Sequence, residues 1–101
     1  MKVRYTATAR DEIADIISYI GRDNPRAAAR VASAIEIAIT LLSRHPRIGR
    51  VMHESGLRGK LVGRFPYRIF YMVTDEELII RNVRSTLRLP PWERQITEID
   101  P

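Results

Sequence analysis

The sequence predicts an α+β fold in which an N-terminal strand and an αα-hairpin precede a three-stranded antiparallel meander. Three observations support this prediction. Residues 2–5 alternate between polar and apolar side chains, residues 9–44 repeat apolar side chains at helical spacing, and residues 66–88 hold two strand-like runs around an acidic turn. A length of 101 residues further predicts a single domain spanning residues 1–101.

The first helix is predicted over residues 9–20, after a short strand at residues 2–5. Thr8 stands three residues before Asp11, a variant of the capping box, and negative charge in the first turn suits the helix macrodipole. Gly21 is expected to cap the C-terminus. The apolar stripe consists of isoleucines at i, i+3, i+4 and i+7, namely Ile13, Ile16, Ile17 and Ile20.

The second helix is predicted from Asn24-Pro25, where Asn24 caps and Pro25 fits the first helical position. It is expected to end near Arg44, because Pro46 disfavours helical geometry at His45. Additional apolar residues widen its buried face, which suggests that this helix is covered on more than one side or binds a partner. They are Ala34, Ile37 and Leu41.

The meander is predicted to follow a loop over residues 46–56. Residues 61–65 are expected to pair with the hairpin formed by residues 66–88. Alternation places Tyr67, Ile69, Tyr71 and Val73 on one face, and Arg68, Phe70 and Met72 on the other. In the last strand, alternation places Ile79, Arg81 and Val83 on one face, and Leu78, Ile80, Asn82 and Arg84 on the other. Residues 92–101 are expected to form a short helix or to extend over the core.

The composition and the N-terminal sequence predict the location of the protein in the cell. The chain has no cysteine, which fits a reducing compartment, and its N-terminus has no apolar run of signal-peptide length. No segment approaches the roughly 20 apolar residues that span a bilayer. The protein is therefore expected to be cytoplasmic, without contact with the membrane.

The positive charge is concentrated in the middle of the chain. The net charge is +5, and residues 44–88 carry 10 basic and 4 acidic groups, or +6. Arginine supplies nine of those ten cations and suits planar recognition of phosphate or carboxylate. The sequence therefore predicts an anionic partner, which is a nucleic acid or an acidic protein segment. The alternative is a solvated surface that promotes solubility.

The sequence lacks most residue patterns that mark metal-binding or catalytic sites. His45 and His53 do not have ligand spacing with each other or with a carboxylate cluster, so no metal site and no cofactor are predicted. His45 is interpreted as a helix-end residue and His53 as a loop residue. RNA cleavage would also need a base and an acid, and only Lys60 or a tyrosine is available beside the arginines.

Several segments, in this order and spacing, resemble the RelE/ParE superfamily of bacterial toxins from type II toxin–antitoxin systems. They cover nearly the whole chain and are residues 14–20, 24–28, 45–50, 57–58, 66–71 and 79–83. The resemblance implies a helical hairpin packed on an antiparallel sheet. It also implies a small, acidic antitoxin with an amphipathic helix, which wraps the toxin and neutralises it in a hetero-oligomer.

Two activities divide the superfamily. ParE-like members poison DNA gyrase, and RelE-like members cut mRNA on the ribosome without a metal. Arg88 and Pro90 match a ParE-like ending, although Ser85 stands where those chains often have histidine, and no tyrosine follows Tyr71 as RelE-like catalysis would require. The resemblance therefore favours a growth-inhibiting, ParE-like gyrase poison, as in plasmid-stabilising modules, that is not an enzyme.

Two other functions stay open: a ribosome-dependent endoribonuclease and a non-toxic module that binds nucleic acids. A nuclease would use Lys60, Arg68, Arg81 and Arg88. In each case the target or the antitoxin is expected to contact the cationic residues of the meander and the tryptophan after it, namely Arg58, Lys60, Arg64, Arg68, Arg81, Arg84, Arg88 and Trp92.

Overall fold

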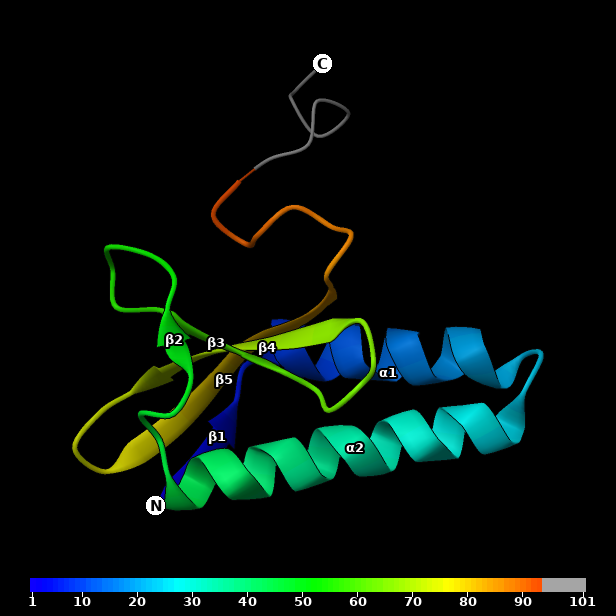
Figure 1. Cartoon of the computed structure of the whole chain (residues 1–101), viewed down its shortest axis with the longest axis horizontal. Coiled ribbons are helices and arrows are strands. Elements are labelled where there is room, and N and C mark those ends of the chain that lie inside the picture. The colour runs from blue at the N-terminus through cyan, green and yellow to red at the C-terminus, as the bar shows by residue number, and fades with distance from the viewer. Residues whose placement is uncertain (94–101) are drawn as a thin grey trace.

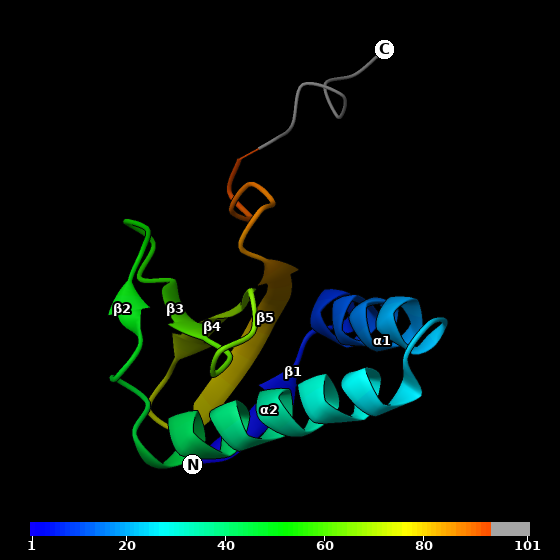
Figure 2. The ribbon, with the colours of Figure 1, turned by 45° about the vertical axis from the view of Figure 1, so that its right-hand side comes forward.

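The computed structural model describes residues 1–93. The short helix or extended segment was predicted for residues 92–101, and the part of it beyond Glu93 lies outside the described residues. Two helices cover one face of a five-stranded sheet (Figures 1 and 2), which confirms the predicted α+β class. The elements are β1 (Lys2–Tyr5), α1 (Ala7–Gly21), α2 (Pro25–Arg44), β2 (Arg50–Val51), β3 (Arg58–Leu61), β4 (Tyr67–Val73) and β5 (Glu77–Ser85). Among these residues no helix is long and apolar enough to cross a membrane.

The sheet has the strand order β1-β5-β4-β3-β2, in which only β1 runs parallel to its neighbour. The predicted meander of β3, β4 and β5 is confirmed. The prediction that residues 46–56 form a loop was partly wrong, because Arg50 and Val51 pair with Gly59 and Arg58. A two-residue strand is too short to show alternation in a sequence.

The strand predicted at residues 61–65 begins and ends earlier, at Arg58 and Leu61. After Leu61 the chain turns, with the Phe65 N–H bonded to the Val62 carbonyl at 3.0 Å. Gly63 has a φ of 54° in this turn, a conformation that other residues adopt at a cost. The predicted strand therefore included a turn.

Thr6, not Thr8, caps α1. Its Oγ1 accepts the Ala9 N–H at 3.0 Å and donates to the Arg81 carbonyl at 2.9 Å. The Thr6 N–H also bonds to the Ile80 carbonyl at 3.0 Å, so pairing with β5 holds Thr6 extended and the helix begins directly after it. Gly21 is still helical, and Arg22 is the C-cap. By contrast, the predicted Asn24 cap, Pro25 start and Arg44 end of α2 are confirmed.

We expect Thr6→Ala to lower the free energy of unfolding by about 1–2 kcal/mol, because it removes a helix cap and a bond to β5. Thr8→Ala is the matched control, since Thr8 is exposed within the first turn and alanine is a good helix former. Urea unfolding followed by circular dichroism measures both. Equal losses in the two variants would contradict the assignment of Thr6 as the cap.

The core lies between the helices and the sheet. Leu42 of α2 is fully buried against residues of β4 and β5, including Ile69, Tyr71 and Ile80. The predicted buried face of α2 is thus confirmed, but two of its widening residues face outward, since Ile37 is 67% exposed and Leu41 is 42% exposed. In β4 the predicted alternation is confirmed, with Ile69 and Tyr71 in the core.

A β-bulge changes the faces of β5. Tyr71 pairs with Ile80 and Phe70 pairs with Asn82, so Arg81 is an extra residue without a partner on β4. Val83 therefore joins Leu78 and Ile80 in the core, and the predicted grouping of Val83 with Ile79 was wrong. The bulge also shifts Asn82 and Arg84 into register with Phe70 and Arg68.

Candidate functional site

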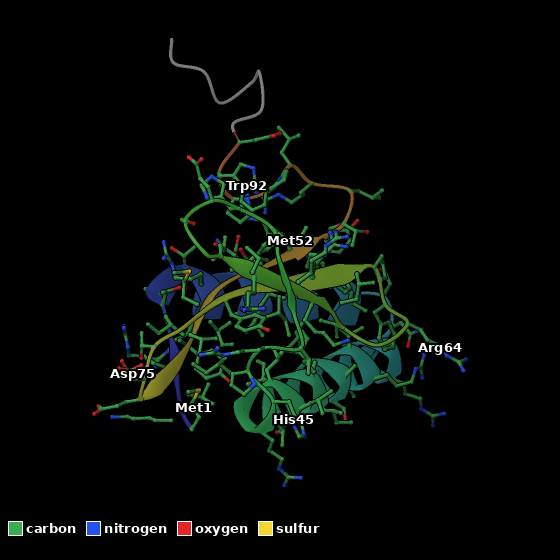
Figure 3. All side chains as sticks on the ribbon, turned by 60° about the vertical axis from the view of Figure 1, so that its left-hand side comes forward. Met1, His45, Met52, Arg64, Asp75 and Trp92 are labelled. Atoms are coloured by element: carbon green, nitrogen blue, oxygen red, sulfur yellow. The ribbon has the colours of Figure 1, made fainter. Side chains whose placement is uncertain are left out.

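The sheet face opposite the helices is called the outer face here. It presents Arg68, Phe70 and Met72 from β4, together with Gly59 and Leu61 from β3. Met52, from the connection between β2 and β3, lies over this face (Figure 3). A Cβ on Gly59 would meet the Met52 sulfur and approach Arg68 Cδ to 3.0 Å, so glycine makes room for both side chains.

A hollow of about 320 Å³ beside β2 and β3 is called the basic hollow. Its cations are Arg50, Lys60 and Arg68, and none of its lining residues is acidic. None of the ion pairs within residues 1–93 involves these three side chains. The remaining walls are Ile48, Met52, Gly59 and Leu61. An anionic group on the outer face therefore finds Arg50 and Arg68 here without a competing carboxylate in the lining.

Arg50 is the member of the basic hollow that sequence reasoning missed. It reaches the hollow because β2 pairs with β3, with Arg50 opposite Gly59. A two-residue strand inside a loop-like segment carries no alternation that would reveal this pairing. Lys60 and Arg68, which were predicted, also line the hollow from the neighbouring strands β3 and β4. Lys60 pairs with Ile69 and Arg68 with Leu61, however, so their side chains leave the sheet on opposite faces.

Arg58 instead has internal partners. Its Nη1 donates to the Gly49 carbonyl at 2.7 Å and to the Arg47 carbonyl at 3.2 Å. In the same region the Tyr71 hydroxyl donates to the Pro46 carbonyl and accepts the Gly49 N–H, both at 2.8 Å. Burial raises the pKa of the Tyr71 phenol above its ordinary 10.0, which keeps the donating proton in place. Arg58 and Tyr71 thus hold the connection from α2 to β2.

Arg84 and Arg88 meet a carboxylate that sequence reasoning did not place among the arginines. Glu12 Oε2 lies 2.9 Å from Arg84 Nε and 3.9 Å from Arg88 Nη1. The other oxygen of Glu12 accepts the Val83 N–H at 3.0 Å and Asn82 Nδ2 at 3.1 Å. Glu12 therefore caps the part of the β5 edge that lies beyond the end of β1.

Two predicted arginines lie apart from these clusters. Arg81 is exposed at the bulge, and its carbonyl accepts the Thr6 hydroxyl. Arg64 lies in the turn between β3 and β4, well away from Met52 and Trp92 (Figure 3). The eight predicted contact residues are therefore distributed over several places, and only Lys60 and Arg68 line the basic hollow.

Trp92 lies on the outer face, where it packs against two aromatic rings. Its ring centroid is 4.9 Å from that of His53, with the ring planes tilted by 35°, and 5.9 Å from that of Phe70, which it meets edge-on. Phe70 is consequently only 4% exposed. Because the His53 ring packs against Trp92, the imidazole lies at the rim of the outer face. The position of His53 in a predicted loop did not reveal this. His45 is the C-cap of α2, as interpreted.

No group of three histidine, cysteine or acidic side chains within residues 1–93 lies close enough to hold a metal ion. The cations of the outer face therefore have no nearby metal-binding cluster among these residues.

Comparison with known proteins gives the family. The sequence model described as "ParE toxin of type II toxin-antitoxin system, parDE" matches residues 3–90. The chain belongs to the ParE toxin family. A curated relative, "Putative toxin Y4kP" of Sinorhizobium fredii, is 32% identical over 89 residues, which is 88% of this chain and 93% of the relative.

Solved structures of related toxins share the fold. The chromosomal ParDE system of P. aeruginosa matches with a TM-score of 0.74 at 19% identity, covering 84% of this chain and 95% of the other. The RelBE2 toxin–antitoxin complex of Mycobacterium tuberculosis matches with a TM-score of 0.58 at 30% identity, covering 83% and 95%. The predicted toxin fold is confirmed, and the protein is a type II toxin of the ParE/RelE superfamily.

Proposed function

We propose that this ParE-family toxin arrests growth by binding and inhibiting DNA gyrase through its outer face. One observation carries the proposal: the basic hollow brings Arg50 and Arg68 together on the outer face without an acidic or imidazole side chain in its lining. Such a lining binds an anionic group but supplies no acid–base pair for cleaving a phosphodiester. A binding poison fits this arrangement better than an enzyme.

The antitoxin is proposed to contact the helices as well as the sheet. A mainly apolar groove of about 560 Å³ runs between α1 and α2, lined by residues such as Ile13, Ile35 and Ile39. On the outside of α2, the exposed Ile37 and Leu41 stand one turn apart. An acidic, amphipathic helix has an apolar face for these residues, and acidic residues elsewhere in the antitoxin would meet the basic hollow on the other side of the sheet.

A ribosome-dependent endoribonuclease is the second candidate, and the position of His53 favours it. The imidazole lies against Trp92 at the rim of the outer face and could serve as an acid or a base. In this case Arg68 would stabilise charge at the phosphorus.

One experiment separates these functions. Purified toxin is expected to inhibit DNA supercoiling by gyrase, and the antitoxin encoded beside it is expected to restore supercoiling. Arg68→Ala should weaken the inhibition at least about tenfold, as expected when an arginine at the centre of an interface is truncated. Arg64→Ala is the matched control, because Arg64 lies outside the basic hollow.

Mapping mRNA 5′ ends in cultures that express the toxin gives the second readout. Intact transcripts with gyrase inhibition would support the first proposal. Cuts within translated codons that disappear in Arg68→Ala would support the nuclease. Normal growth with salt-sensitive nucleic-acid binding would instead indicate the non-toxic module, because phosphate contacts weaken steeply with salt.

A further inference from the structure

A second surface, separate from the basic hollow, lies where α1 meets the ends of β4 and β5. Two hollows of about 510 and 130 Å³ share Asp15, Ile16, Tyr67 and Ser85, so they adjoin, and together they are called the α1 groove here. Ile16 and Tyr67 supply an apolar middle. Because the groove lies between a helix and strand ends, it offers a path for an extended or helical segment.

Cations stand at both ends of the α1 groove. At one end the Arg22 guanidinium lies 5.8 Å from the centre of the Tyr19 ring, which is 71% exposed. At the other end are Arg84 and Arg88. Asp15 lies in the stretch shared by the two hollows. An occupant with acidic residues at its ends and neutral, apolar residues between them complements this pattern of charges.

The two arginines at the Glu12 end differ in how firmly they are held. Arg84 bonds to Glu12 at 2.9 Å and to the Leu89 carbonyl at 3.3 Å, and its side chain is 18% exposed. Arg88 is 3.9 Å from the same carboxylate oxygen, beyond hydrogen-bond distance, and its side chain is 45% exposed. Among the described residues, Arg84 is therefore firmly held, whereas Arg88 has only one long contact with Glu12.

The residue beside Arg88 indicates what kind of partner binds. Leu87 is 92% exposed, which is the highest exposure among the large apolar residues of the described chain. A leucine next to a loosely paired arginine matches a protein segment that brings a carboxylate together with an apolar side chain. A nucleic-acid backbone offers the negative charge but no aliphatic surface for Leu87.

We infer that Glu12 is an internal counter-ion for Arg88. A carboxylate of the antitoxin replaces Glu12 as the partner of Arg88 when an acidic–apolar segment of the antitoxin binds along the α1 groove and Leu87. The inference rests on the proposed antitoxin partnership. Before binding, Glu12 neutralises part of the positive charge of the groove. On binding, Arg88 exchanges a long intramolecular contact for a direct ion pair, and Glu12 keeps Arg84 and the β5 edge in place.

The test measures the affinity of the purified antitoxin for toxin variants at low and high salt. Glu12→Gln should bind about threefold more tightly at low salt, because a charge that repels the incoming carboxylate is removed while the amide oxygen can still accept the Val83 N–H. High salt should reduce this gain. Arg88→Ala should weaken binding about tenfold, and Glu12→Gln should bring no gain in the Arg88→Ala background.

Glu77→Gln is the matched control. It removes the same charge at the opposite end of β5, where Glu77 pairs with Arg4 at 3.2 Å. It should leave antitoxin affinity unchanged. Equal effects of Glu12→Gln and Glu77→Gln would overturn the inference, because net charge alone would then explain the gain.

Substitutions at two exposed positions still test the inference if Glu12→Gln does not fold. Leu87→Ser and Arg88→Ala must both weaken binding, and wild-type affinity in both variants would overturn it. If the antitoxin fails to bind even the wild-type toxin, the antitoxin partnership itself is contradicted. If it binds the wild type normally and ignores these substitutions, only the inference about Glu12 and Arg88 fails.

Discussion

Leu42→Ala is expected to lower the free energy of unfolding by about 2–5 kcal/mol. Leu42 is fully buried in the core between α2 and the sheet, so its truncation removes apolar contact and leaves a cavity. Single domains are stable by only about 5–15 kcal/mol, so this loss is a large fraction of the total. Thermal unfolding should shift downward by about 4–8 °C for each kcal/mol lost.

Leu41→Ala is the matched control for this prediction. It makes the same chemical change one residue earlier on α2, but Leu41 is 42% exposed and its truncation leaves no enclosed cavity. We expect it to cost well under half as much as Leu42→Ala. Similar losses in both variants would mean that α2 is rotated about its axis relative to the sheet. Antitoxin affinity measured on Leu41→Ala would also test the exposed face of α2.

Gly49→Ala is expected to destabilise the toxin by about 2–4 kcal/mol, combining overpacking with a broken hydrogen bond. A Cβ at Gly49 would overlap the Tyr71 hydroxyl and approach the ring carbons Cε1 and Cζ to 2.6 and 2.8 Å. Tyr71 is fully buried, so its ring can move only if its neighbours move as well. Urea unfolding gives the loss.

A double-mutant cycle with Tyr71→Phe checks the cause. Tyr71→Phe alone should cost about 1–3 kcal/mol, because the Gly49 N–H and the Pro46 carbonyl lose their partner. Gly49→Ala should then cost less in the Tyr71→Phe background than in the wild type, because the hydroxyl it collides with is gone. Strict additivity would show that the hydroxyl is not the source of the strain.

Much of the fold could be predicted from local patterns. The spacing of isoleucines in α1, the Asn24-Pro25 start of α2 and the stop before Pro46 depend on side chains close in sequence, so they can be read directly. The alternation of β4 likewise separated Ile69 and Tyr71 from Arg68 and Phe70. The candidate site was predictable to the extent that this alternation places Arg68 on the face away from the core.

The remaining features depend on partners distant in the chain. Thr6 became the cap because its backbone pairs with Ile80, although Thr8 has the better local pattern. The bulge at Arg81 moved Val83 into the core, and the pairing of β2 with β3 brought Arg50 to the basic hollow. Arg84 also belongs to a structural ion pair, because Glu12 approaches it from a helix 72 residues earlier.

The sequence by itself thus determined the α+β class, both helices, the meander and a concentration of cations over residues 44–88. These follow from side-chain periodicity and capping, which act over a few neighbouring residues. Only the tertiary structure decided which cations are available to a ligand. Arg50, Lys60 and Arg68 line a hollow without an acid, whereas Arg58 bonds to backbone carbonyls and Arg84 to Glu12. The reason is that a charge is free or neutralised according to its neighbours in space, and strand pairing and helix packing choose those neighbours.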